Sequence, residues 1–267
     1  MLISFKKNWK IYLIEAWGLG MFMVSASVFT ILIFHQNSPI NTKIHSDFTK
    51  RLLIGTAMGL TAIFLIYSNW GKKSGTHINP AVTLAQYQLD RISLEDAIFY
   101  IIFQFIGSIL GVAIVYFILP EYLSNPSVNF AITTPGKGNW AALYSEFSLS
   151  FSMLTMVLTI SNYPKLAPFT GYFVGFTLAM FITFEAPFSG MSMNPARTFG
   201  SAFWANIWTS LWIYFLAPIA GMQAAAWLYR KDYLAKKGEC GSMKMHFSGE
   251  KHNCQTYEVL KIYEKNK

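Results

Sequence analysis

Six long apolar segments constrain the fold of this chain more than any other feature of its sequence. Each is close to the roughly 17–25 residues that a helix needs to cross the hydrocarbon core of a membrane. Glu15 and Glu146 are the only acidic residues inside the segments, and no Lys or Arg interrupts any of them. We therefore predict an all-α membrane protein with six transmembrane helices. The predicted spans are 11–34, 52–70, 97–119, 139–160, 166–184 and 207–229.

The composition agrees with a membrane protein. Hydrophobic residues make up 53% of the chain and charged residues only 13%, against about 25% charged residues in soluble globular proteins. The net charge of +8 at pH 7 reflects basic flanks around the apolar segments. Such flanks set the orientation of a membrane protein, so we expect a lipid bilayer and no nucleic acid as their partner.

A tripeptide occurs twice, as Asn79-Pro80-Ala81 and as Asn194-Pro195-Ala196. An Asn before a Pro is typical of a helix start, because the Asn side chain caps free N–H groups and Pro has no N–H to leave unpaired. The apolar runs that follow, from Val82 to Tyr87 and from Thr198 to Trp204, are too short to cross a bilayer at ~1.5 Å per residue. The pattern predicts two re-entrant half-helices, and hence a pore.

The two halves of the chain resemble each other. Each has a Glu in its first span, Glu15 or Glu146, and an Asn-Pro-Ala motif after its second. Three spans per half place the motifs on opposite sides, so we predict an inverted repeat of about 11–120 and 139–230 whose half-helices meet near the midplane. Glycine pairs at four-residue spacing predict close helix contacts. They are Gly55/Gly59, Gly107/Gly111 and Gly171/Gly175.

The basic residues between the spans predict the orientation. Six spans put four basic regions on one side of the membrane, so both termini are expected to be cytoplasmic in a multi-pass protein of the cell membrane. The first outer loop runs against this pattern with Lys43, Lys50 and Arg51. The four regions contain Lys6, Lys7 and Lys10; Lys72, Lys73 and Arg91; Lys165; and Arg230 and Lys231.

The polar segment 231–267 is expected to be a cytoplasmic tail. It contains Cys240, His246, His252 and Cys254, which are residues of metal-ligand type. Their separations match none of the usual zinc patterns. We therefore expect no metal site and a solvated tail, with a metal-binding regulatory tail as the alternative.

With its twin Asn-Pro-Ala motifs in inverted six-span halves, the chain resembles the aquaporin, or major intrinsic protein, family over about residues 11–230. The resemblance implies a channel domain over residues 1–230, with its half-helices meeting at Asn79 and Asn194, and a homotetramer with one pore per chain. The positive ends of both half-helices would then meet at the midplane and repel cations and hydronium. The resemblance also implies that the two Asn amides donate hydrogen bonds to passing water and disrupt a proton-conducting chain.

Four further residues follow from the motifs. Arg197 directly follows the second motif in an apolar neighbourhood, where a charge is functional by default, and the resemblance makes it part of a narrow outer filter. Glu15 and Glu146 are expected to accept hydrogen bonds from the re-entrant loops, because buried carboxylates need partners. His77 lines the cytoplasmic vestibule or serves as a structural hydrogen-bonding residue, and the sequence leaves both open.

The other filter positions are found by counting from the motifs. Without gaps, the position in the second span falls on Gly59, or on Met58 if the loop holds one extra residue. The position in the fifth span falls on Ile182, or on Thr183 with a similar shift, and the third lies at Met191. The aromatic and the His of a strict water filter are absent, which predicts a constriction that is wider or more apolar than in water-only members.

Other positions favour water. Thr198 stands where glycerol-conducting members usually carry Asp, and the pair Tyr214-Phe215 in the sixth span is aromatic. We predict a passive channel whose main permeant is water and which excludes ions and protons. Whether small neutral solutes also pass is left open by the sequence. The alternatives are a channel mainly for glycerol, urea or ammonia, an ion-coupled secondary transporter, and a structural role with a closed pore. No cofactor is expected. The sequence contains neither a nucleophile–base set nor a phosphate-binding loop, so we do not expect an enzyme.

Overall fold

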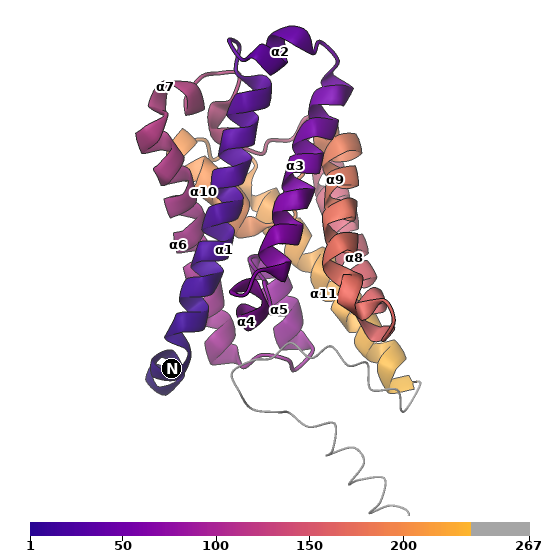
Figure 1. Cartoon of the computed structure of the whole chain (residues 1–267). Helices are drawn as coiled ribbons and strands as arrows, with labels where there is room; N and C mark the ends of the chain where they lie inside the picture. The colour runs from indigo at the N-terminus through magenta and orange to yellow at the C-terminus, as the bar shows by residue number, and fades with distance from the viewer. Residues whose placement is uncertain (236–267) are drawn as a thin grey trace, which may run out of the picture.

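The computed structural model describes the backbone of residues 1–235 and the side chains of residues 1 and 3–231, and this part of the chain contains helices and no strand (Figure 1). Six of its helices are long and apolar enough to cross a membrane, which confirms the predicted spans. The tail residues Cys240, His246, His252 and Cys254 lie outside the described residues. The long helices are α1 (Leu2–Phe34), α3 (Asp47–Tyr67), α6 (Leu94–Ile118), α8 (Asn139–Asn162), α9 (Thr170–Ser189) and α11 (Leu211–Ala235).

Two half-helices begin at the repeated motifs. Helix α5 (Pro80–Gln88) has 9 residues and α10 (Pro195–Ala205) has 11, so at ~1.5 Å per residue neither spans a bilayer. Each has Asn at its N-cap and Pro in its first turn, as predicted. Shorter helical pieces connect the long helices. They are α2 (Pro39–Lys43), α4 (Gly71–Ser74), α7 (Pro120–Leu123), η1 (Asn129–Ala131) and η2 (Ala167–Phe169).

The helix contacts repeat between the two halves. Helix α1 packs on α6 as α8 packs on α11, and α3 packs on its counterpart α9. Each half-helix contacts the last long helix of the other half, α5 on α11 and α10 on α6. In Figure 1, α10 lies nearer the α2 end of the bundle and α5 nearer the N-terminal end. This arrangement is the predicted inverted repeat.

Helix boundaries differ from the predicted spans by several residues. Helix α3 ends at Tyr67, before the predicted 70, and α11 begins at Leu211, after the predicted 207, whereas other helices extend further than predicted. Helix α1 begins at Leu2 and not near residue 11, and its first turns are held to α6 because Asp96 accepts hydrogen bonds from Ser4 Oγ at 2.6 Å and Asn8 Nδ2 at 2.9 Å. Helix α9 continues to Ser189, so Glu185 also lies inside a span. An apolar run locates the hydrocarbon core, whereas the helix continues for as long as its backbone hydrogen bonds are satisfied.

Glycine permits the closest helix contacts, as its spacing predicted. A Cβ at Gly59 on α3 would lie 2.4 Å from the carbonyl oxygen of Gly175 on α9. Likewise a Cβ at Gly107 on α6 would lie 2.1 Å from the carbonyl oxygen of Ala16 on α1. Backbone oxygens cannot move aside as the end of a side chain can, so these positions tolerate no larger residue without separating the helices.

We expect Gly59→Leu to lower the free energy of unfolding by about 2 kcal/mol or more, because overpacking here pushes backbone against backbone. The measurement is the midpoint of thermal unfolding in detergent micelles. Thr56→Leu is the matched control, since it places the same side chain on the exposed face of the same helix. Equal midpoints for the two variants would contradict the proposed role of Gly59 in packing.

Candidate functional site

The two motifs meet head to head inside the bundle. Asn79 Nδ2 donates a hydrogen bond to the carbonyl of Met193 at 2.7 Å, and Asn194 Nδ2 donates to the carbonyl of Ile78 at 2.8 Å. Each Asn Oδ1 caps its own half-helix. An amide nitrogen carries two protons, so each Asn keeps one N–H beyond the bond across the junction. The junction therefore offers two N–H donors at the meeting point of the half-helices.

The loops that lead into the motifs have an unusual backbone. Thr76 and Ile78 have φ values of 50° and 37°, and Met191 and Met193, at the matching positions, have 51° and 53°. Left-handed conformations in side-chain-bearing residues cost roughly 1–3 kcal/mol each and persist only where surrounding contacts enforce them. They turn the carbonyls of Ile78 and Met193 toward the opposing Asn residues.

Two buried carboxylates supply those contacts. Glu15 Oε1 and Oε2 accept the backbone N–H groups of His77 at 3.1 Å and Ile78 at 2.6 Å. Glu146 Oε1 and Oε2 accept those of Ser192 at 2.8 Å and Met193 at 2.6 Å. Both side chains are 0% exposed. The structure thus places each Glu beneath a re-entrant loop as a hydrogen-bond acceptor.

Different neighbours complete the two carboxylate sites. Gln104 Nε2 donates to Glu15 at 2.8 Å and also contacts Thr83 Oγ1 at 3.0 Å. Glu146 accepts the hydroxyl of Ser189 at 2.7 Å, and Ser74, at the matching position before the first motif, hydrogen-bonds to Glu15. The Ser189 hydroxyl also lies 2.9 Å from Glu185 Oε2. The symmetry of the fold therefore extends to the carboxylates and their serines and ends at Gln104 and Glu185.

His77 is held in a buried hydrogen bond. Its Nδ1 lies 3.1 Å from Thr83 Oγ1, its ring centroid is 5.1 Å from that of Tyr100, and the residue is 2% exposed. These contacts favour His77 as a structural hydrogen-bonding residue over His77 as a residue that lines the vestibule. The position two residues before Asn79 nevertheless keeps His77 next to the junction.

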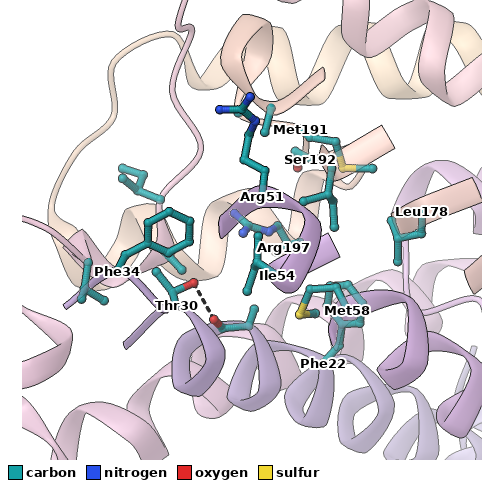
Figure 2. A pocket seen from close by; sticks show the side chains of 17 residues that line it. Phe22, Thr30, Phe34, Arg51, Ile54, Met58, Leu178, Met191, Ser192 and Arg197 are labelled. Atoms are coloured by element: carbon teal, nitrogen blue, oxygen red, sulfur yellow. Dashed lines mark hydrogen bonds between the residues drawn. The ribbon is translucent and has the colours of Figure 1, made fainter. Parts of the chain in front are cut away.

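A cavity of about 280 Å³ opens between α1, α3, α9 and the loop before α10 (Figure 2). We call it the mouth cavity. Its lining combines aliphatic, aromatic and Met side chains with a few polar groups, and its floor includes residues next to the second motif. The lining residues are Phe22, Ala26, Thr30, Phe34, Arg51, Ile54, Met58, Val128, Ala131, Ile132, Leu178, Ile182, Ala186, Gly190, Met191, Ser192 and Arg197.

The structure separates the filter candidates into two groups. Arg197, Met58, Ile182 and Met191 line the mouth cavity. Gly59, the ungapped choice in the second span, does not reach it, because Gly59 faces Gly175 across the α3–α9 contact.

Thr183, the shifted choice in the fifth span, also lies at that contact. It is 1% exposed, its hydroxyl donates to the Ala179 carbonyl, and a Cβ at Gly55 would lie 2.9 Å from it. The cavity wall therefore contains Met58 from α3, the position obtained with a one-residue shift, and Ile182 from α9, the position obtained by counting without gaps.

Arg197 is positioned by the start of α10. Its backbone N–H donates to Asn194 Oδ1 at 3.2 Å, and its Nη1 lies 3.5 Å from Thr133 Oγ1. The Thr133 hydroxyl is 2.9 Å from that of Thr198, which also contacts the hydroxyl of Ser192. Thr198 thus joins a buried chain of hydroxyl groups next to the Arg197 guanidinium. Glycerol-conducting members usually carry an Asp carboxylate at this position.

Three site residues were missed from the sequence. Phe22 supplies an aromatic wall from α1, and Arg51 supplies a second guanidinium from α3. Arg51 lies seven residues before Met58, on the same helix face, and this spacing could have indicated it. Glu185 lies one residue beyond the predicted end of its span, so a longer span would have included it.

Comparisons with known proteins agree on one family. The profile described as "Major intrinsic protein" matches residues 3–229. The probable aquaporin AqpM of Archaeoglobus fulgidus is 36% identical over 191 residues, which cover 69% of this chain and 76% of that protein. Aquaporin NIP2-1 of Zea mays is 36% identical over 184 residues, covering 68% of this chain and 60% of that protein.

Among solved structures, the aquaglyceroporin from Plasmodium falciparum matches with a TM-score of 0.70 and 20% identity, covering 83% of this chain and 95% of that one. This likeness shows that the two chains share a fold. The profile match over residues 3–229 and the 36% identity to the archaeal protein lead to one conclusion: the chain belongs to the major intrinsic protein family.

Proposed function

We propose that the chain is a passive channel for water and small neutral solutes that excludes ions and protons. The observation that carries the proposal is the junction of Asn79 and Asn194, where two half-helices entering from opposite ends present their N-termini to each other. Two converging positive helix ends repel a cation, whereas a neutral molecule is not repelled. The remaining amide N–H groups are donors to the oxygen of a passing molecule.

The mouth cavity is the proposed outer entrance, with Arg197 at its narrow end. In this orientation both termini are cytoplasmic, residues 1–230 form the channel and 231–267 form the tail. A homotetramer with one pore per chain is the expected assembly. A secondary transporter is the weaker candidate, because Glu15 and Glu146 are already engaged by the loops that they support.

Passage of solutes larger than water is the second candidate function. Met58 and Ile182 face the cavity where a strict water filter would carry an aromatic and a His. A flexible thioether chain yields to a solute more readily than a rigid ring does, and this favours glycerol, urea or ammonia as additional permeants. Thr198 and the pair Tyr214-Phe215 favour water as the main one.

Proteoliposomes that contain the full chain should shrink rapidly under an osmotic gradient, with a low activation energy, because water would cross without leaving a hydrogen-bonded path. Stopped-flow light scattering measures the rate, and the same vesicles are then tested with glycerol, urea and ammonia. Empty vesicles of the same lipid are the control. Shrinkage at the rate of empty vesicles would overturn the water assignment.

Arg197→Ala should let cations and larger neutral solutes pass, because it removes the positive charge and the side-chain volume at the narrow end of the mouth cavity. The solute reflection coefficient and a cation-flux assay measure the change. Arg197→Lys should lie between wild type and Ala, since it keeps the charge but loses the planar fork of donors. Unchanged reflection coefficients in Arg197→Ala would contradict this role.

Met58→Phe should reduce glycerol flux severalfold while reducing water flux much less, because a rigid ring narrows the cavity wall. The ratio of glycerol to water permeability is the measurement. Leu60→Phe is the matched control, as Leu60 lies on the exposed face of the same helix and is 62% exposed. A ratio that falls equally in both variants would refute the assignment of Met58 to the constriction.

A further inference from the structure

The mouth cavity holds two guanidinium groups and no carboxylate. Arg51 enters it from α3 and Arg197 from the first turn of α10, and Figure 2 shows both side chains in the same cavity. Thr30 and Ser192 are the only other polar side chains in the lining. Within the described part of the chain, neither arginine forms an ion pair with an acidic side chain. Glu146 attracts Arg197 electrostatically from beneath the loop, but no carboxylate lines the cavity, so Arg51 and Arg197 meet no counter-charge inside it.

A proline on the neighbouring helix holds Arg51 in place. Pro187 lies inside α9 and has no N–H, so the carbonyl of Thr183, four residues earlier, lacks its helical donor. Arg51 Nε donates to that carbonyl at 3.0 Å. The bond occupies Nε and leaves the terminal Nη groups of Arg51 as donors at the cavity.

Two like charges in one small cavity repel each other, and an apolar lining screens them less than bulk water would. An anion bound between the two guanidinium groups would reduce this repulsion and accept hydrogen bonds from them. Planar oxyanions fit best, because the N–H groups of a guanidinium pair with two oxygens of one carboxylate. A volume of about 280 Å³ holds such an ion together with a few waters, at about 30 Å³ per water.

We propose that Arg51 and Arg197 form a binding site for a small monovalent carboxylate in the mouth cavity. The anion sits across the entrance of the conduit, so its binding reduces the passage of neutral molecules. Only this blocking effect rests on the proposed channel function. The binding itself depends on the two arginines alone.

Binding is tested by calorimetric titration of sodium formate into the full chain in detergent micelles. Ionic strength is held constant with lactobionate, a bulky anion. Formate should bind to the wild type, and R51Q should weaken binding roughly tenfold or more, the effect of losing hydrogen bonds to a charged group. R51K should fall between the two, because it keeps the charge and loses the fork.

K50Q is the matched control variant. Lys50 precedes Arg51 on the same helix and carries the same charge, but its ammonium bonds to Asn41 Oδ1 and it does not line the mouth cavity. K50Q should bind formate as the wild type does. Equal affinity in wild type and R51Q, equal weakening in K50Q and R51Q, or no heat of binding in the wild type would each overturn the proposal.

The blocking effect is measured as osmotic water permeability of proteoliposomes with increasing formate at constant ionic strength. Permeability should fall with formate in the wild type and in K50Q, and much less in R51Q. The two proposals fail differently. Formate binding in a chain that conducts no water would refute only the channel, whereas fast shrinkage without formate binding would refute only the anion site.

Discussion

Two buried carboxylates support the re-entrant loops on which the rest of this structure depends. A loop at membrane depth exposes backbone N–H groups that no water can satisfy, and each unpaired group costs several kcal/mol. Glu15 and Glu146 each accept two of them, one per carboxylate oxygen. The left-handed backbone at Ile78 and Met193 is thereby held, and with it the carbonyls that position the opposing Asn residues.

The junction is symmetric, but the entrance above it is not. Both halves repeat the same Glu, the same left-handed positions and the same Asn–carbonyl bond, because each half-helix has to be stabilised in the same way. The mouth cavity is instead lined by Arg51, Met58, Ile182 and Arg197, which come from both halves and have no symmetric counterparts in the lining. In the function that we propose, one set of contacts builds the conduit and this separate set of side chains selects what enters it.

The sequence predicted the spans, the half-helices and the inverted repeat, because apolar length and an Asn-Pro pair act locally. It could not choose between Gly59 and Met58, since one residue in a loop rotates the next helix by about 100° at 3.6 residues per turn. Such a rotation decides whether Met58 or Gly59 faces the cavity, and the other residue then lies at the contact with α9. Glu185 was not predicted because the apolar run ends before the helix does.

Arg51 illustrates why some site residues can be recognised only in three dimensions. Its place at the cavity depends on the carbonyl of Thr183, which is available because Pro187 lacks an N–H. None of these three residues indicates the site alone, and they come from two helices in different halves of the repeat. A proline usually weakens a helix by leaving a carbonyl unpaired; here that carbonyl anchors a charge at the mouth cavity, so the interruption in α9 is also what positions the second guanidinium.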